Sequence, residues 1–216
     1  MTLAARLSFA MYFTVLAAGS LRGADSKTTY TINPAKSKIE IQVAKEGFFK
    51  AFGHDHLVSA THFSGSVQLT AAKMEESSVT FTAEANSLHV IDPGESEKDR
   101  SEVEATMLGE HVLDVARYPR IQFASSAVKV ASASKNAFEL QVSGTLTLHG
   151  KEKSVILPVH VQISDEGSLT CETEVSLLQS DFGIVPYKAA GGAVKVKDKL
   201  KLTFHIVAAK ASSSPN

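Results

Sequence analysis

The chain has 216 residues, a formal net charge of −1 and 44% apolar residues. This length suits one domain or at most two small ones, and the nearly neutral charge gives no field that would favour nucleic acid or an anionic membrane. Cys171 is the only cysteine, which excludes an intrachain disulfide and a zinc site built from several cysteines.

The first 24 residues have the order of an export signal. Arg6 precedes an apolar run over residues 7–18, and small residues follow up to position 24. An uncleaved membrane anchor is the alternative, but a membrane span needs about 20 apolar residues. We therefore expect a signal peptide over 1–24, cleaved between 19 and 24, and a periplasmic or secreted bacterial protein. Residues 25–210 would form the folded domain, and 211–216 a disordered polar tail.

From residue 28 onward, apolar and polar residues alternate. The clearest runs cover residues 38–43, 79–85, 138–149 and 199–206. Such alternation is typical of strands with one dry and one wet face. Turn residues separate the runs, so the pattern predicts an all-β, antiparallel up-and-down meander. About eight strands of this kind close into a barrel without exposed edges, and the barrel is either filled by its side chains or holds one ligand.

One charged segment, residues 95–116, breaks the alternation. Acidic residues crowd its start, and apolar residues then recur at a nearly helical spacing. We expect a helix from about Glu97 to Leu108, interrupted near Gly109 and followed by a short second turn to Ala116. The segment would be a surface crossover between two strands, a lid over one barrel mouth, or both.

Several motifs resemble the YceI-like polyisoprenoid-binding family, in that family's order, between Tyr30 and Val207. The most distinctive is DVARYPRIQFAS at residues 114–125. The others are YTINP at 30–34, FSGSVQL at 63–69, VSGTLTLHG at 142–150, KSVILP at 153–158 and SDFG at 180–183. Residues 107–110 depart from the family pattern, because they lack a basic residue at the end of the helix.

The resemblance implies a lipocalin-like barrel of eight antiparallel strands with an elongated apolar cavity for an isoprenoid chain. Such a chain offers no hydrogen bonds along its length, so shape and apolar burial must recognise it. Because the ligand would come from a membrane, we expect a carrier that makes transient membrane contact to exchange it. The expected function is binding of a polyisoprenoid or an isoprenoid quinone, without catalysis, cofactor or nucleic acid.

The cavity lining should come from the apolar face of each strand. The predicted lining residues are Phe63, Val67, Leu69, Val79, Phe81, Phe123, Phe138, Leu140, Val142, Leu146, Leu148, Val155, Leu157, Val159, Phe204 and Ile206. Ordinary core packing is the alternative for each of them. A filled barrel would favour a scaffold that binds another protein through the 95–116 segment.

His54 and His56 are the alternative site, because two imidazoles on one strand face could bind a metal or act catalytically at the barrel mouth. His111 or His149 could contribute, but the sequence specifies no third ligand. The inward face of residues 63–69 is odd-numbered, which places both histidines outward unless a bulge intervenes. We predict no metal site.

Catalytic signatures are equally weak. The sequence has no nucleophile elbow, phosphate-binding loop or dinucleotide fingerprint. Cys171 falls within a predicted strand, where a lone cysteine is usually an inert small residue. Tyr118 and Pro119 open another strand, and we expect their role to be structural.

Overall fold

The computed structural model describes residues 27–46, 55–189, 191 and 194–211. The predicted signal peptide at 1–24, residues 212–216 of the predicted tail, and His54 lie outside this part of the chain. Within it, no helix is both long enough and apolar enough to cross a membrane.

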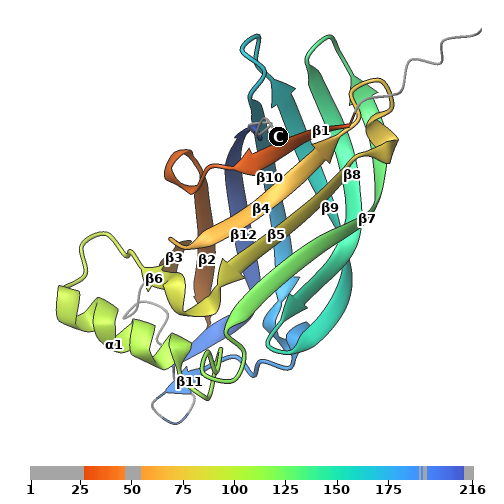
Figure 1. Cartoon of the computed structure of the whole chain (residues 1–216). Helices are drawn as coiled ribbons and strands as arrows, with labels where there is room; N and C mark the ends of the chain where they lie inside the picture. The colour runs from red at the N-terminus through yellow and green to blue at the C-terminus, as the bar shows by residue number, and fades with distance from the viewer. Residues whose placement is uncertain (1–26, 47–54, 190, 192–193, 212–216) are drawn as a thin grey trace, which may run out of the picture.

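Strands make up most of the described chain (Figure 1). They are β1 (Thr28–Ile32), β2 (Lys38–Glu46), β3 (His56–Ala60), β4 (Phe63–Leu69), β5 (Ser78–Glu84), β6 (Leu88–Val90), β7 (Arg120–Ala133), β8 (Ala137–Leu148), β9 (Lys151–Ile163), β10 (Leu169–Leu178), β11 (Lys188–Ala189) and β12 (Val194–Lys210). The helices are α1 (Glu97–Leu108) and the short 3-10 helices η1 (Pro34–Lys36), η3 (Met74–Glu76), η4 (Ala85–Ser87) and η5 (Gln179–Phe182).

The sheet closes into an antiparallel barrel. The pairing order is β1-β4-β5-β7-β8-β9-β10-β12, and β12 pairs back with β1. The segments β2, β3 and β6 prolong three of these eight strands: η1 separates β1 from β2, residues 61–62 separate β3 from β4, and η4 separates β5 from β6. The predicted eight-stranded up-and-down barrel is therefore confirmed.

The long connection between β6 and β7 carries α1, over the predicted residues. Ser96 caps the helix by accepting a hydrogen bond from the backbone N–H of Asp99 at 3.1 Å. The helix ends before Gly109, and short hydrogen-bonded turns continue to Tyr118, among them Val112 N–H to the Gly109 carbonyl. Figure 1 places α1 beside β6, at one end of the barrel, which we call the α1 end.

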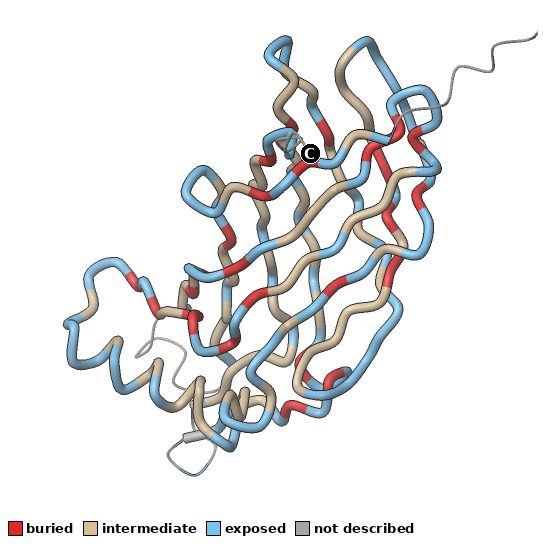
Figure 2. Tube along the Cα trace, viewed as in Figure 1, coloured by how far each residue is buried: buried red, intermediate tan, exposed pale blue. Residues whose placement is uncertain are grey.

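The opposite end, which we call the η3 end, is tightly packed. Leu169 and Ala208 are fully buried there, and Leu69 and Met74 are nearly so. Elsewhere much of the barrel wall is only partly buried, as the tan segments of Figure 2 show. The interior is therefore closed at the η3 end and looser toward the α1 end.

The ladder between β9 and β10 is incomplete. These strands pair only through residues 160–163 and 169–172, at the η3 end. Nearer the α1 end, η5 lies against β9, where the Lys153 ammonium is 3.8 Å from the Asp181 carboxylate. Because β9 and β10 are not paired toward the α1 end, the barrel wall can spread at that end.

Tyr118 has the structural role that was expected. Its ring lies 4.4 Å from the His149 ring, centroid to centroid. It also covers Gly150, where an added Cβ would lie 2.5 Å from the tyrosine ring. Gly150 has a φ of +69°, so this turn needs a residue free to adopt the left-handed region and small enough to fit under the ring.

Candidate functional site: an apolar cavity within the barrel

The barrel encloses a cavity of about 660 Å³. This volume lies within the range of roughly 300–1,000 Å³ that is typical of small-molecule sites. Strands from around the barrel and α1 contribute to its wall, and most lining side chains are aliphatic or aromatic. A few polar side chains also reach it: Lys45, His56, Ser77, Ser78, Glu102, Thr106, Thr173, Gln179 and Tyr187.

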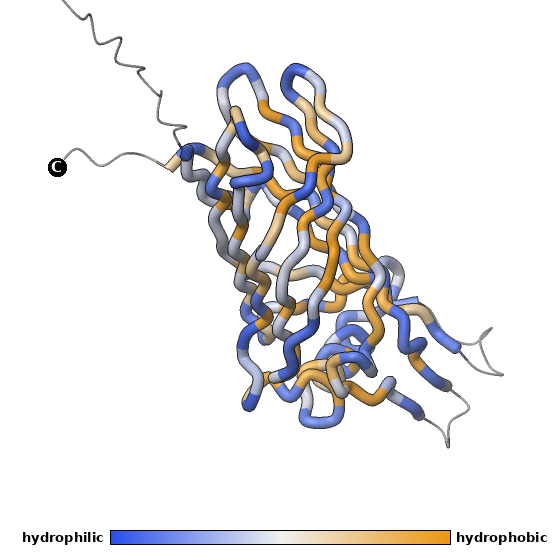
Figure 3. Tube along the Cα trace, turned by 90° about the vertical axis from the view of Figure 1, so that its right-hand side faces the viewer, coloured by the Kyte–Doolittle hydropathy of each residue, from blue (hydrophilic) through white to orange (hydrophobic). Residues whose placement is uncertain are grey.

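The inward side chains fill only part of the barrel: the rings of Phe81 and Phe204 meet inside it, with centroids 6.4 Å apart, but most lining side chains are only partly buried. Along β9, Val155, Leu157 and Val159 point inward and are only half-buried, while their neighbours Ile156 and Pro158 are exposed outside. A similar alternation of partly buried and exposed residues runs along β10 and over residues 199–204 of β12. Figure 3 shows apolar (orange) and polar (blue) segments mixed along the strands of the barrel. Apolar surface that remains accessible inside a closed sheet is the condition for binding an apolar ligand.

Most of the residues predicted to line the cavity do so in the structure. They are Val67, Leu69, Val79, Phe81, Phe123, Leu140, Val142, Leu146, Leu148, Val155, Leu157, Val159, Phe204 and Ile206. Phe63 and Phe138 are not among the lining residues. Phe63 is buried in the core, where its ring lies 5.9 Å from that of Phe81, and Phe138 packs against the core near the start of β8.

Other lining residues were missed by sequence reasoning. From the strands they include Ile39, Ile41, Val43, Val58, Val90, Val175, Leu177, Leu200 and Leu202, and from α1 they include Val103 and Met107. The alternation along residues 39–43 and 200–206 was a usable signal for several of them. The α1 residues carry no such signal, because only the position of the helix at the mouth brings them to the cavity.

His56 faces the cavity, and the expectation that it faces outward was wrong. Val58 and Ala60 are buried on even-numbered positions, whereas Phe63 and Leu69 are buried on odd-numbered ones. The bend at residues 61–62 causes this change of parity. His56 lies opposite the inward-facing Val43 in the ladder between β2 and β3.

His56 is held by a buried carboxylate. Its Nδ1 lies 2.6 Å from Oδ2 of Asp92, a residue that is only 4% exposed. The other carboxylate oxygen, Oδ1, accepts a hydrogen bond from the backbone N–H of Leu57 at 2.5 Å. Both oxygens of Asp92 therefore serve to position the start of β3 and the His56 ring.

The described residues contain no cluster of three or more potential metal ligands. Of the two further histidines considered for a metal site, His111 is exposed beside Glu110, and the ring of His149 packs against that of Tyr118 at a tilted angle. His54, the remaining member of that alternative, lies outside the described residues.

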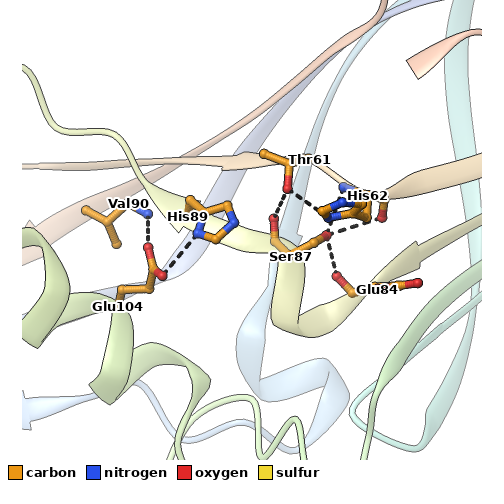
Figure 4. A network of polar contacts seen from close by, with 7 residues as sticks. All are labelled: Thr61, His62, Glu84, Ser87, His89, Val90 and Glu104. Atoms are coloured by element: carbon orange, nitrogen blue, oxygen red, sulfur yellow. Dashed lines mark hydrogen bonds and ion pairs between the residues drawn. The ribbon is translucent and has the colours of Figure 1, made fainter. Parts of the chain in front are cut away.

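Glu104 attaches α1 to the barrel, as Figure 4 shows. Its Oε2 accepts a hydrogen bond from the Val90 N–H at 2.9 Å, and its Oε1 lies 3.0 Å from Nδ1 of His89. No residue of the helix is buried, yet Val103 and Met107 line the cavity. The crossover thus also forms part of the wall at the mouth.

The η5 segment forms another part of this end. Gln179, which lines the cavity, donates a hydrogen bond from Nε2 to the Lys197 carbonyl at 2.9 Å. Asp198 accepts hydrogen bonds from the hydroxyl and the backbone N–H of Ser180, and these bonds hold the pKa of Asp198 below its usual value. Val185 and Tyr187, which follow η5, expose apolar surface to solvent.

Cys171 lines the cavity and can report on its contents. Burial raises the pKa of its thiol to about 11, so only about one thiol in a thousand is ionised at pH 8. We expect slow alkylation by an apolar iodoacetamide, a rate that rises about tenfold per pH unit up to about pH 10, and further slowing by bound lipid. Protein unfolded in urea is the control. A rate that lipid leaves unchanged would contradict a ligand beside Cys171.

Comparison with known proteins places this barrel in a family. The model of the YceI-like domain matches residues 30–208. The structure of BcnA from Burkholderia cenocepacia is similar, with 25% identity and a TM-score of 0.63 over 82% of this chain and 99% of that one. None of the curated proteins compared with the chain matches it.

Two further solved structures share the fold. A polyisoprenoid binding domain from Saccharophagus degradans, implicated in plant cell wall breakdown, has 14% identity and a TM-score of 0.60 over 86% of this chain and all of that one. The YceI protein of Campylobacter jejuni has 15% identity and a TM-score of 0.54 over 72% of this chain and 85% of that one. The fold agrees with that of these structures, and the match to the YceI-like domain over most of the chain shows that this protein belongs to the YceI-like family.

Proposed function

We propose that this protein is an exported carrier that holds one long apolar lipid, a polyisoprenoid or an isoprenoid quinone, inside the barrel. The observation that carries the proposal is the unfilled cavity of about 660 Å³ with its almost entirely apolar wall. The similarity in fold to a polyisoprenoid binding domain supports the same class of ligand.

The chemistry of the wall suits a hydrocarbon chain. Aliphatic and aromatic side chains offer dispersion contacts but no hydrogen bonds, and a chain of isoprene units asks for none. Each buried methylene-sized unit contributes about 0.8 kcal/mol against water, but nearly nothing against a bilayer, which is equally apolar. The protein can therefore take a lipid from a membrane and return it without crossing a large free-energy difference.

Exposed apolar side chains support exchange at a membrane surface. Val185, Tyr187 and Leu178 lie in or beside the η5 segment, and Tyr187 also lines the cavity. Large exposed apolar side chains gathered near a ligand site are typical of contact surfaces. We propose that this end of the barrel touches the membrane briefly while the lipid enters or leaves.

Lipid extraction tests the proposal. Protein purified from its native host, from the periplasm or the medium, is expected to yield about one isoprenoid lipid per chain by mass spectrometry of the organic extract. The delipidated protein should then take up geranylgeraniol stoichiometrically. Protein that carries no lipid and takes none up would overturn the proposal. Stoichiometric metal in the same preparation would favour a metal site at the barrel mouth instead.

A further inference from the structure

The pair formed by His56 and Asp92 has a geometry that the apolar cavity does not require. Both oxygens of Asp92 accept hydrogen bonds, one from the Leu57 N–H and one from His56 Nδ1. A carboxylate in this role has no proton to donate, so the Nδ1 atom of His56 carries the hydrogen. In the neutral ring, Nε2 is then left with a free lone pair.

The position of His56 directs this lone pair toward the cavity. The ring lines the cavity, whereas Asp92 is buried and does not line it. The two ring nitrogens point in divergent directions, so a ring that turns Nδ1 toward Asp92 presents Nε2 to the cavity side. None of the hydrogen bonds of the described chain uses His56 Nε2.

We propose that His56 Nε2 accepts a hydrogen bond from a hydroxyl group at the polar end of the lipid, which makes the ligand an isoprenoid alcohol or quinol. The inference rests on the proposed function, because it concerns the same cavity. The apolar tail then runs toward the η3 end. An ether, an ester or a quinone carbonyl offers only acceptors and gains nothing from a neutral Nε2.

The distribution of polar groups favours this orientation of the lipid. Lys45 is a neighbour of His56, because Val43 pairs with His56 and Lys45 is the next inward residue on the same strand. Glu102 and Thr106 reach the cavity from α1. At the η3 end Ser77 is already satisfied, because its Oγ accepts from the Thr70 N–H and donates to the sulfur of Met74. The charged side chains of the cavity wall, Lys45 and Glu102, therefore lie at the α1 end, where a polar headgroup would meet them beside His56.

The test compares two ligands with the same chain, geranylgeraniol and its methyl ether, on delipidated protein. Wild-type protein should bind the alcohol about threefold to tenfold more tightly than the ether, the value expected for one hydrogen bond. His56→Leu should bind both ligands with the affinity of the ether. The matched control is His160→Leu, because His160 Nδ1 also lies 2.6 Å from a carboxylate, Glu139, but in an exposed pair.

A second variant tests the direction of the hydrogen bond. In Asp92→Asn the amide oxygen can keep the Leu57 N–H, which turns the amide NH2 toward His56 Nδ1. Nδ1 must then accept, the ring hydrogen moves to Nε2, and the lone pair facing the cavity is lost. The oxygen of either ligand can then accept a hydrogen bond from Nε2–H, so the ether should bind about as tightly as the alcohol and the preference should disappear. This result would not follow if His56 only packed against the lipid.

The outcomes separate the two proposals. If wild-type protein binds neither ligand, the proposed function fails. If it binds both equally, or if the preference survives in both His56→Leu and Asp92→Asn, the headgroup inference fails and the lipid cavity stands. Should His56→Leu not fold, because Asp92 is left buried without its partner, the Asp92→Asn comparison decides.

Discussion

Replacing Leu157 by Trp is expected to lower the affinity for a prenyl lipid about 100-fold while the barrel stays folded. Leu157 lines the cavity and is only half-buried, so the indole can extend into the void without overpacking a dense core. Displacing three or four methylene-sized units of lipid costs about 2.5–3 kcal/mol at about 0.8 kcal/mol each, which corresponds to about a 100-fold loss. Titration of delipidated wild-type and Leu157→Trp protein with geranylgeraniol measures the two affinities.

The neighbouring residue provides the control. Ile156 is on the same strand but faces outward and is 64% exposed. Ile156→Trp adds the same side chain outside the barrel, so the affinity should stay within about twofold of wild type. If Leu157→Trp bound lipid as tightly as Ile156→Trp, the lipid would have to lie somewhere other than this cavity.

Truncating Phe182 to Ala should lower the free energy of unfolding by about 3–5 kcal/mol, the usual range for a buried Phe. Phe182 is 1% exposed and is among the largest fully buried side chains of the described residues. It lies in η5, which Gly183 ends with a φ of +73°. Removing the ring would leave a cavity beneath this turn. Urea unfolding monitored by circular dichroism should show a lower midpoint with an unchanged slope.

Val185→Ala is the control for Phe182. Val185 lies three residues further along and is 69% exposed, so its truncation should change the free energy of unfolding by less than about 0.5 kcal/mol. A small effect in both variants would mean that η5 adds little to the stability of the barrel. The segment would then be free to open, and its part in the cavity wall would need another explanation.

Alternation predicted the antiparallel strands, and the resemblance to the YceI-like family implied that eight of them close into a barrel. A strand places successive side chains on opposite faces, so residues such as Val155, Leu157 and Val159 had to share one face wherever the strand lay. Closure removes the sheet edges, so long strands with short turns led to an up-and-down barrel. The charged segment with acidic residues at its start likewise identified α1 correctly. Export, which depends on residues 1–24, stays a prediction.

The sequence could not determine the relation between segments that a bend separates. Counting from residues 63–69 placed His56 outside, because one irregular step at residues 61–62 reverses which positions face inward. His56 and Asp92 are 36 positions apart in the sequence, with β4, β5 and β6 between them. A local sequence pattern cannot predict a contact between residues so far apart in the sequence. Only the register of β2, β3 and β6 sets it.

The same limit applies to the void. The sequence determined that apolar side chains point inward, because the period of two follows from backbone geometry alone. Whether those side chains meet across the axis depends on the barrel's width and on where strands part, as β9 and β10 do beyond residues 160 and 172. Packing is a property of distances between strands that are remote in sequence, so the tertiary structure alone decided that the barrel is hollow.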